Sequence, residues 1–395
     1  MLWRKFAPHV FPSVPRGRTA PPHVLARGFE MPTVLPLIIR APLSYSHDQL
    51  YGSTGDDSLV SGAGDDTLWS SIGDDVLDGG GDHDLAVYEN QTAGITVTVS
   101  GTGMTVTKAA GGTDSLSGIE SLHGSNFADT IALALSGTLF DRAGNDTVQA
   151  AATGTRFLAG SGDDSFVGGA GFDILNLSDD GFDGAGSATV GVTLTMSGTG
   201  TGQVTDSWGG TDVFSGIDSI RGSEFDDSLT GGTGNDLIEG GAGDDVIAGG
   251  TGSDTLLGGD GDDTITPGSS GVFDAIVAGR GNDTVDLTGI ASAQDVPGLY
   301  HFNLDAGITL DIDGPTDTGQ VDKGANGLTT LLGAGQAMST GSLLLFGSSH
   351  DDLFRVTPTA GAWLAIAGEA GDDTISITGT DGVVRLDYLS DAIAT

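Results

Sequence analysis

Between residues 231 and 266 one apolar position recurs every nine residues, occupied by Ile238, Ile247, Leu256 and Ile265. Each lies in the middle of a three-residue segment of strand-like sequence. Side chains on a strand alternate between its two faces, so the recurring residue is expected to face inward and its neighbours outward. A strand this short cannot bury an apolar face alone. The pattern therefore predicts many short strands stacked on one another.

The residues between these strands are equally regular. The segment reads GGTGNDLIE, GGAGDDVIA, GGTGSDTLL and GGDGDDTIT, with glycine at positions one, two and four, and Asp at position six. Glycine reaches positive φ without a Cβ clash, which permits a tight turn. Such turns leave carbonyl oxygens without a partner in the strand ladder. A fixed period with these constraints predicts one backbone unit, repeated and stacked.

The predicted stack brings acidic side chains together. If two units make one full coil, units eighteen residues apart lie above one another, and their Asp side chains and turn carbonyls meet in the gap. Carboxylates gathered there repel one another unless a cation lies between them. Ca²⁺ takes roughly six to eight oxygen ligands, carboxylate and carbonyl mixed. Bound calcium is therefore predicted to close the gaps.

The units resemble the RTX, or haemolysin-type, calcium-binding nonapeptide G-G-x-G-x-D-x-U-x. The resemblance is specific because it recurs in register over 231–266. It implies an all-β chain with a parallel β-roll, a β-solenoid of stacked nonapeptides, and several calcium ions along both edges.

Two weaker blocks share the period, and the candidate calcium ligands come from all three blocks. Position six is held by Asp57, Asp66, Asp75 and Asp84 in the first block, by Asp146, Asp164 and Asp173 in the second, and by Asp227, Asp236, Asp245, Asp254, Asp263 and Asp283 in the third. Backbone carbonyls near Gly232, Gly234, Gly241, Gly243, Gly250 and Gly252 are expected to add ligands.

Eighteen-residue spacing pairs these residues. The predicted sites are Asp57/Asp75, Asp66/Asp84, Asp146/Asp164, Asp227/Asp245, Asp236/Asp254 and Asp245/Asp263. Thr155 stands where an Asp is expected opposite Asp173, so that site should be weak or empty. Two extra residues after Thr266 place Asp254/Asp274 and Asp263/Asp283 twenty apart. Whether these two pairs stack stays open from the sequence.

Segments without the nonapeptide separate the blocks. The alternating run Ile95–Ser100 predicts a strand, and 111–130 is nearly copied at 209–228, so a longer unit of nonapeptides and connector also repeats. Phe127 and Phe225 replace the position-four glycine in both copies and are expected to plug the end of a coil.

This division predicts the organisation of the chain. It comprises a basic, Pro-rich and disordered extension (1–47), the first block (48–87), a strand-rich connector (88–141), the second block (142–176), a second connector (177–221), the third block (222–286), a strand-rich segment (287–346), and C-terminal single repeats with a candidate export signal (347–395). A capping strand for the last coil is an alternative for that tail.

Composition and charge limit the classes of molecule that this chain is expected to bind. The formal net charge is −40, although residues 1–47 carry six Lys or Arg and one Glu, so the rest is more acidic still. Such a body repels nucleic acid and anionic lipid and attracts cations. The chain has no Cys, which excludes disulfides. No apolar run reaches the roughly 18 residues of a transmembrane segment.

The chain shows no familiar catalytic signature. HExxH, G-x-S-x-G and a P-loop lysine motif are all missing, which argues against a protease, lipase or nucleotide-binding enzyme. The favoured function is a secreted, extracellular calcium-binding protein that Ca²⁺ folds after passage through export machinery. Two alternatives stay open: a structural or adhesive surface protein, and a polysaccharide lyase or epimerase. Incubation with uronate polymers, followed by a search for new unsaturated ends or a changed epimer ratio, would identify a lyase or epimerase. Either alternative implies a polysaccharide or cell-surface partner.

Overall fold

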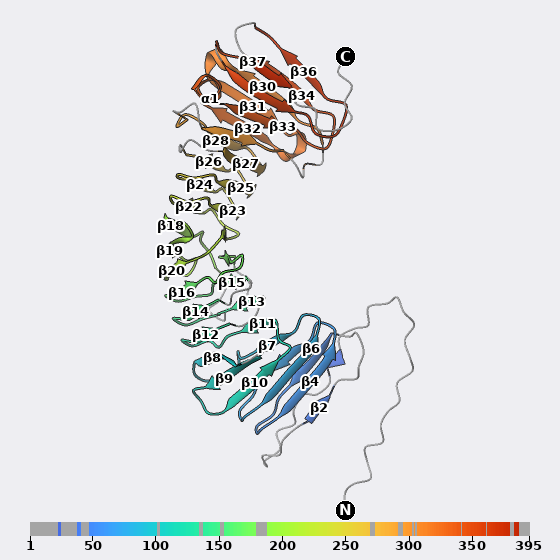
Figure 1. The fold of residues 1–395 in the computed structure, drawn as a ribbon, viewed down its shortest axis with the longest axis vertical. Coiled ribbons are helices and arrows are strands. Elements are labelled where there is room, and N and C mark those ends of the chain that lie inside the picture. The colour runs from blue at the N-terminus through green and yellow to red at the C-terminus, as the bar shows by residue number, and fades with distance from the viewer. Residues whose placement is uncertain are drawn as a thin grey trace, which may run out of the picture.

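The computed structural model describes residues 23–24, 38–40, 47–100, 103–133, 137–150, 154–178, 188–268, 273–290, 295–301, 304, 306–340, 342–360, 362–379 and 383–386. The chain winds as a β-solenoid in which each coil gives one strand to each of two ladders (Figure 1). The predicted all-β fold of stacked parallel strands is confirmed.

The first ladder, sheet A, is parallel throughout and has sixteen strands among the described residues. In ladder order these are β1 (His23–Val24), β3 (Asp48–Tyr51), β5 (Thr67–Trp69), β7 (Leu85–Val87), β11 (Ser121–His123), β13 (Thr138–Phe140), β15 (Arg156–Leu158), β17 (Ile174–Asn176), β21 (Ser219–Arg221), β23 (Leu237–Ala242), β25 (Thr255–Asp260), β27 (Phe273–Arg280), β29 (Val296–Leu299), β33 (Leu343–Phe346), β35 (Trp363–Ala367) and β37 (Val383–Leu386).

The second ladder, sheet B, includes antiparallel pairs. In ladder order its strands are β2 (Ile38–Arg40), β4 (Ser58–Ala63), β6 (Val76–Gly81), β10 (Thr113–Ser117), β9 (Gly103–Lys108), β8 (Ile95–Ser100), β12 (Thr130–Ala132), β14 (Thr147–Gln149), β16 (Ser165–Val167), β20 (Thr211–Ser215), β19 (Thr201–Thr205), β18 (Thr193–Gly198), β22 (Ser228–Thr230), β24 (Val246–Ala248), β26 (Thr264–Thr266), β28 (Asp283–Asp286), β32 (Leu328–Leu332), β31 (Thr318–Asp322), β30 (Thr309–Asp313), β34 (Leu353–Thr357) and β36 (Thr374–Ile377).

The register follows the sequence period. Ile247 pairs with Ile265, eighteen residues later. Past the two extra residues the spacing becomes twenty, and Ile265 pairs with Val285. The extra residues therefore leave the ladder intact.

Three antiparallel insertions interrupt sheet B alone. The first insertion is β8–β10, the second is β18–β20 and the third is β30–β32, and each lies in the ladder in reverse chain order. Sheet A continues past them without extra strands, through β7–β11, β17–β21 and β29–β33. Since strands lie about 4.8 Å apart, each insertion lengthens sheet B by roughly 10 Å. The middle of the stack is accordingly bent, with sheet B on its outer side (Figure 1).

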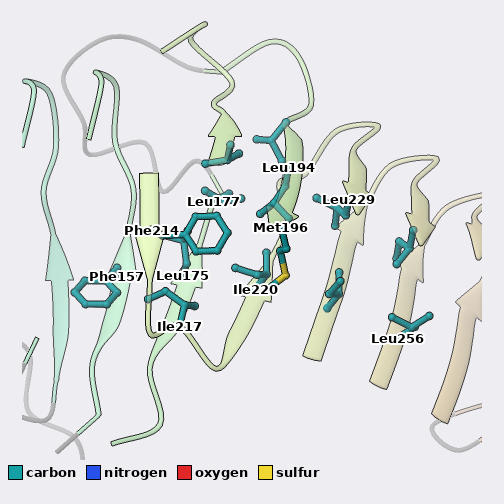
Figure 2. Close-up of a cluster of buried hydrophobic side chains, with 14 of the residues drawn as sticks. Phe157, Leu175, Leu177, Leu194, Met196, Phe214, Ile217, Ile220, Leu229 and Leu256 are labelled. Carbon is teal, nitrogen blue, oxygen red and sulfur yellow. The ribbon is translucent and has the colours of Figure 1, made fainter. Parts of the chain in front are cut away.

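One continuous core fills the space between the ladders. Ile238, Ile247, Leu256 and Ile265 are all fully buried, as their position in the repeat predicts. The second insertion adds Leu194, Met196 and Phe214 to the row that contains Phe157 and Leu229 (Figure 2). The insertions are therefore packed into the solenoid as part of its core.

Some of the predictions concern the N-terminal and C-terminal segments, parts of which lie outside the described residues. The predicted disordered extension, 1–47, falls mostly outside the described residues, but β1 and β2 within it continue the two ladders. The last residues of the candidate export signal, 387–395, are outside them too. Two 3-10 turns, η1 (Gly314–Thr316) and η2 (Gly324–Asn326), flank β31. Within the described ranges the α-helix is α1 (Ala334–Thr340), whose seven residues are too few to cross a membrane.

The prediction that Phe127 plugs a coil is wrong. Its side chain is 44% exposed and that of Phe225 is half-buried. Position four lies in the turn, where the backbone passes directly over the next coil: a Cβ built on Gly144 would lie 2.5 Å from the carbonyl carbon of Phe127. The aromatic side chain therefore points away from the stack.

We predict that Leu256→Ala lowers the free energy of unfolding by about 2–5 kcal/mol, because it leaves a cavity between the two ladders. Val246→Thr is the control, since Val246 is 53% exposed and Thr keeps the β-branch; it should change stability by less than about 0.5 kcal/mol. Urea unfolding in saturating calcium measures both. Equal losses would contradict the inward orientation of position eight.

Candidate metal centre

The position-six Asp residues form a row that links consecutive coils. The Oδ1 atom of Asp245 accepts the backbone N–H of Asp227 at 2.8 Å, and Oδ1 of Asp263 accepts that of Asp245 at 2.9 Å. These carboxylates are buried. The predicted stacking of Asp residues is thus present, with a backbone amide of one coil fixing the carboxylate of the next.

The row of position-six Asp residues continues past the two extra residues that follow Thr266. The N–H of Asp254 donates to Oδ1 of Asp274 at 3.0 Å, and that of Asp263 donates to Oδ1 of Asp283 at 3.2 Å. The two pairs left open by their twenty-residue spacing therefore stack as the others do.

The second carboxylate oxygen divides the candidate ligands into two groups. We call open carboxylates those whose buried Oδ2 accepts no hydrogen bond from the described part of the chain: Asp66, Asp84, Asp146, Asp164, Asp245, Asp254 and Asp263. An unpartnered buried carboxylate oxygen is costly, because it has lost water and gained nothing in return. These oxygens are the atoms that a cation would satisfy.

The other candidate ligands have a bonded Oδ2, and we call them capped carboxylates. The Oδ2 atoms of Asp57, Asp75, Asp173, Asp227 and Asp236 accept the backbone N–H four residues earlier, and that of Asp283 accepts bonds from Lys323 and Thr329. Among the predicted pairs, Asp66/Asp84, Asp146/Asp164 and Asp245/Asp263 have open carboxylates on both sides.

Burial makes the open carboxylates poor anions. Desolvation, together with repulsion by Asp245 and Asp283, raises the pKa of Asp263 to about 8, against an opposing hydrogen bond from Asp245. The same causes raise the pKa of Asp245 to about 7. Asp146 has a pKa of about 8, raised by desolvation and by its Asp neighbours. A divalent cation between coils would offset both desolvation and repulsion.

A turn carbonyl lies beside the open oxygen of Asp245. A Cβ built on Gly240 would lie 2.1 Å from Oδ2 of Asp245 and 2.5 Å from the carbonyl oxygen of Gly258. The carboxylate and the position-one carbonyl of the next coil thus approach one point, which explains the need for glycine at position one.

The position-two and position-four carbonyls have other neighbours. That of Gly232 accepts the N–H of Thr251 at 3.0 Å. A Cβ at Gly252 or Gly261 would lie 1.8 or 1.9 Å from the carbonyl oxygen of Gly234 or Gly243, one coil earlier. These two glycines also have φ of 143° and 146°. The predicted ligand role of these carbonyls, and of those of Gly241 and Gly250, stays a prediction.

Sequence reasoning missed several members of the acidic row. Asp114 and Asp212, in the insertions, accept the backbone N–H of Asp75 and Asp164 at 2.9 Å each. Both end a G-G-T-D segment. Because residues 209–228 nearly copy 111–130, the sequence could have shown that Asp114 and Asp212 are equivalent. Asp129 likewise accepts the N–H of Ile95 at 2.7 Å.

A second, exposed row was also missed. Position-five side chains bond in the opposite direction, since Oδ1 of Asp226 accepts the N–H of Asp244, and Oδ1 of Asp244 accepts that of Asp262, both at 2.8 Å. The D-D and N-D pairs of the repeats were a visible signal for it. A turn with Asp at both positions, such as that of Asp244 and Asp245, therefore carries one buried and one exposed acidic tie.

Comparison with known proteins agrees with this geometry. The profile of the RTX calcium-binding nonapeptide repeat matches four segments, residues 51–86, 157–180, 212–247 and 239–270. No curated protein matches significantly over the chain. Among solved structures, the extracellular lipase LipA from Serratia marcescens aligns at 14% identity with a TM-score of 0.21. That alignment covers 77% of this chain and 38% of the lipase chain, so this chain spans well under half of the lipase.

We predict that Asp245→Ala raises the calcium midpoint of folding by roughly tenfold, equivalent to about 1.4 kcal/mol, because its open oxygen faces a site and its carboxylate ties two coils. Asp173→Ala should shift the midpoint less, since both Asp173 oxygens already accept amide hydrogen bonds. Circular dichroism during calcium titration compares the two. Identical midpoints would contradict the distinction between open and capped carboxylates.

Without calcium, we predict that stability falls as pH rises. The folded state keeps protons on carboxyls such as Asp263 and Asp146, with pKa about 8, whereas the unfolded chain releases them above the ordinary value of 3.8. The unfolded state therefore binds fewer protons between about pH 4 and 8, and the free energy of unfolding declines across that range. The β signal in chelator should be greater at pH 5 than at pH 8. A signal that grows with pH would refute this account.

Proposed function

We propose that this chain, which carries four copies of the RTX calcium-binding nonapeptide repeat, is a secreted protein whose fold Ca²⁺ completes after export. The observation that carries the proposal is the row of open carboxylates, buried between coils with unpartnered oxygens. Their donors are carboxylate and carbonyl oxygens, the ligands that Ca²⁺ prefers.

The energetics suit a calcium-dependent fold. Extracellular modules bind Ca²⁺ with Kd of roughly 10⁻⁴–10⁻³ M. At ten times Kd one site stabilises the folded state by about 1.4 kcal/mol. Seven open carboxylates could supply several such sites, for a total comparable with the roughly 5–15 kcal/mol by which domains are stable. Calcium could therefore decide whether this chain folds.

The compartment follows from the same affinity. Calcium in the cytosol is far below these dissociation constants, whereas millimolar external calcium is near or above them. The chain would remain extended before export and fold on arrival. RTX repeats are typical of secreted proteins, which supports this part of the proposal.

We expect a calcium titration at pH 7.5 to produce a cooperative gain of β signal in far-ultraviolet circular dichroism, with a midpoint in the ~0.1–1 mM range. Magnesium at equal concentration is the control and should fold the chain poorly, because it requires a tighter octahedral geometry and dehydrates reluctantly. A chelator-treated chain that keeps its full β signal and compact size would refute the proposed function.

A further inference from the structure

Each antiparallel insertion directs one side chain into the stack from the turn between its last two strands in chain order. The residue is Lys108 in the first insertion, Asp206 in the second and Lys323 in the third. Each donates its backbone N–H to the carbonyl of the glycine four residues later, at 3.0, 3.1 and 2.8 Å respectively. All three are buried. They therefore occupy equivalent places.

In the first insertion this place holds an ammonium group. Nζ of Lys108 lies 3.2 Å from Oδ2 of Asp75 and 2.5 Å from Oδ1 of Asp114. It also donates to the carbonyl oxygen of Ser71 at 2.7 Å and to Oγ of Ser70 at 3.3 Å. Two carboxylates, a carbonyl and a hydroxyl thus surround a positive charge, as oxygens surround a hard cation.

The third insertion repeats this arrangement. Nζ of Lys323 donates to Oδ2 of Asp283 and, at 2.8 Å, to the carbonyl oxygen of Gly279. Gly279 and Ser71 are equivalent, since each precedes the Asp of its own unit by four residues. In both insertions the chain supplies its own cation to the acidic row.

The second insertion places a carboxylate where the others place ammonium. Asp164 and Asp212 correspond to Asp75 and Asp114, since in each pair the N–H of the first donates to Oδ1 of the second. Asp206 stands at the turn position that lysine occupies in the other insertions. The Oδ2 atoms of Asp164, Asp206 and Asp212 are buried and accept no hydrogen bond from the described residues. A Cβ built on Gly210 would lie 2.7 Å from Oδ2 of Asp206 and 1.8 Å from the carbonyl oxygen of Gly162, two residues before Asp164. Oδ1 of Asp206 accepts the N–H groups of Trp208 and Gly210 in its own turn, which leaves Oδ2 as the unpartnered atom. The second insertion thus adds a third acidic group at the place where the other two carry an ammonium group.

Two further carboxylates adjoin this group. Ligand oxygens of Asp141, Asp146 and Asp164 lie within 4.8 Å of one another. Asp141 occupies position one, where the strongest repeats have glycine, and its Oδ1 accepts the N–H of Gly160 at 2.7 Å while its buried Oδ2 has no partner among the described residues. The adjacent Arg142 is directed to Glu89 at 3.5 Å and to Asn126 at 2.9 Å.

We propose that Asp164, Asp206 and Asp212, with Asp141 and Asp146 beside them, form a Ca²⁺ site that extends beyond the nonapeptide pair Asp146/Asp164, and that Lys108 and Lys323 act as tethered cations which keep the equivalent places free of metal. The inference rests on the proposed function for the identity of the ion. Its own basis is that Asp206 stands in the second insertion at the turn position that Lys108 and Lys323 occupy in the other two. Calcium there supplies the charge that lysine supplies in the other two.

A reciprocal exchange in the full-length chain tests the proposal. Equilibrium dialysis with radioactive calcium at pH 7.5 gives the number of ions bound. Asp206→Lys should bind one ion fewer than the unaltered chain, and Lys108→Asp should bind one more. Glu224→Lys is the matched control, because it makes the same charge change at an exposed residue and should leave the number unchanged.

The outcomes separate this inference from the proposed function. An unaltered count in Asp206→Lys, beside normal binding by the unaltered chain, would overturn the inference and leave the proposed function standing. If Asp206→Lys does not fold, Asp206→Asn, of nearly equal shape, should also lose one ion, and an unaltered count there would overturn the inference. A chain that binds no Ca²⁺ in any form would overturn the proposed function, and the inference with it.

Discussion

The stack depends on a bond between the backbone amide of one coil and the Asp carboxylate of the next. The bond from Asp245 N–H to Asp263 is repeated along both ladders, so each coil fixes its neighbour at the turn as well as at the strand. It also draws carboxylates such as those of Asp245 and Asp263 out of water. Where Oδ2 finds no donor, the fold contains a buried anion whose charge must be neutralised by a proton or a metal ion.

The chain meets this constraint in three ways. Some carboxylates turn Oδ2 to an amide of their own loop, as Asp173 and Asp236 do. At two insertions a lysine enters the row. Elsewhere the oxygens stay open, and the proposed function places the dependence on metal there. On this proposal, the calcium requirement of a repeat depends on the groups that surround its Asp as well as on the Asp itself.

Much of this was predictable from the sequence, because its period fixes both coil and register. Ile247 and Ile265 had to face inward, and Asp245 had to lie next to Asp263. What sequence could not predict is set by tertiary contacts. The difference between Asp236 and Asp245 depends on whether the Gly232 amide or its counterpart in the next unit turns toward Oδ2. The role of Lys108 depends on an insertion that returns along the ladder in reverse order, which no local pattern specifies.

The most direct test of this account is anomalous X-ray diffraction from crystals of the calcium-saturated protein. The account predicts peaks between the coils, beside Oδ2 of the open carboxylates along 231–266, and no peak beside the ammonium groups of Lys108 and Lys323. Well-ordered coils along 231–266 without any anomalous peak, in crystals grown with ample calcium, would contradict it.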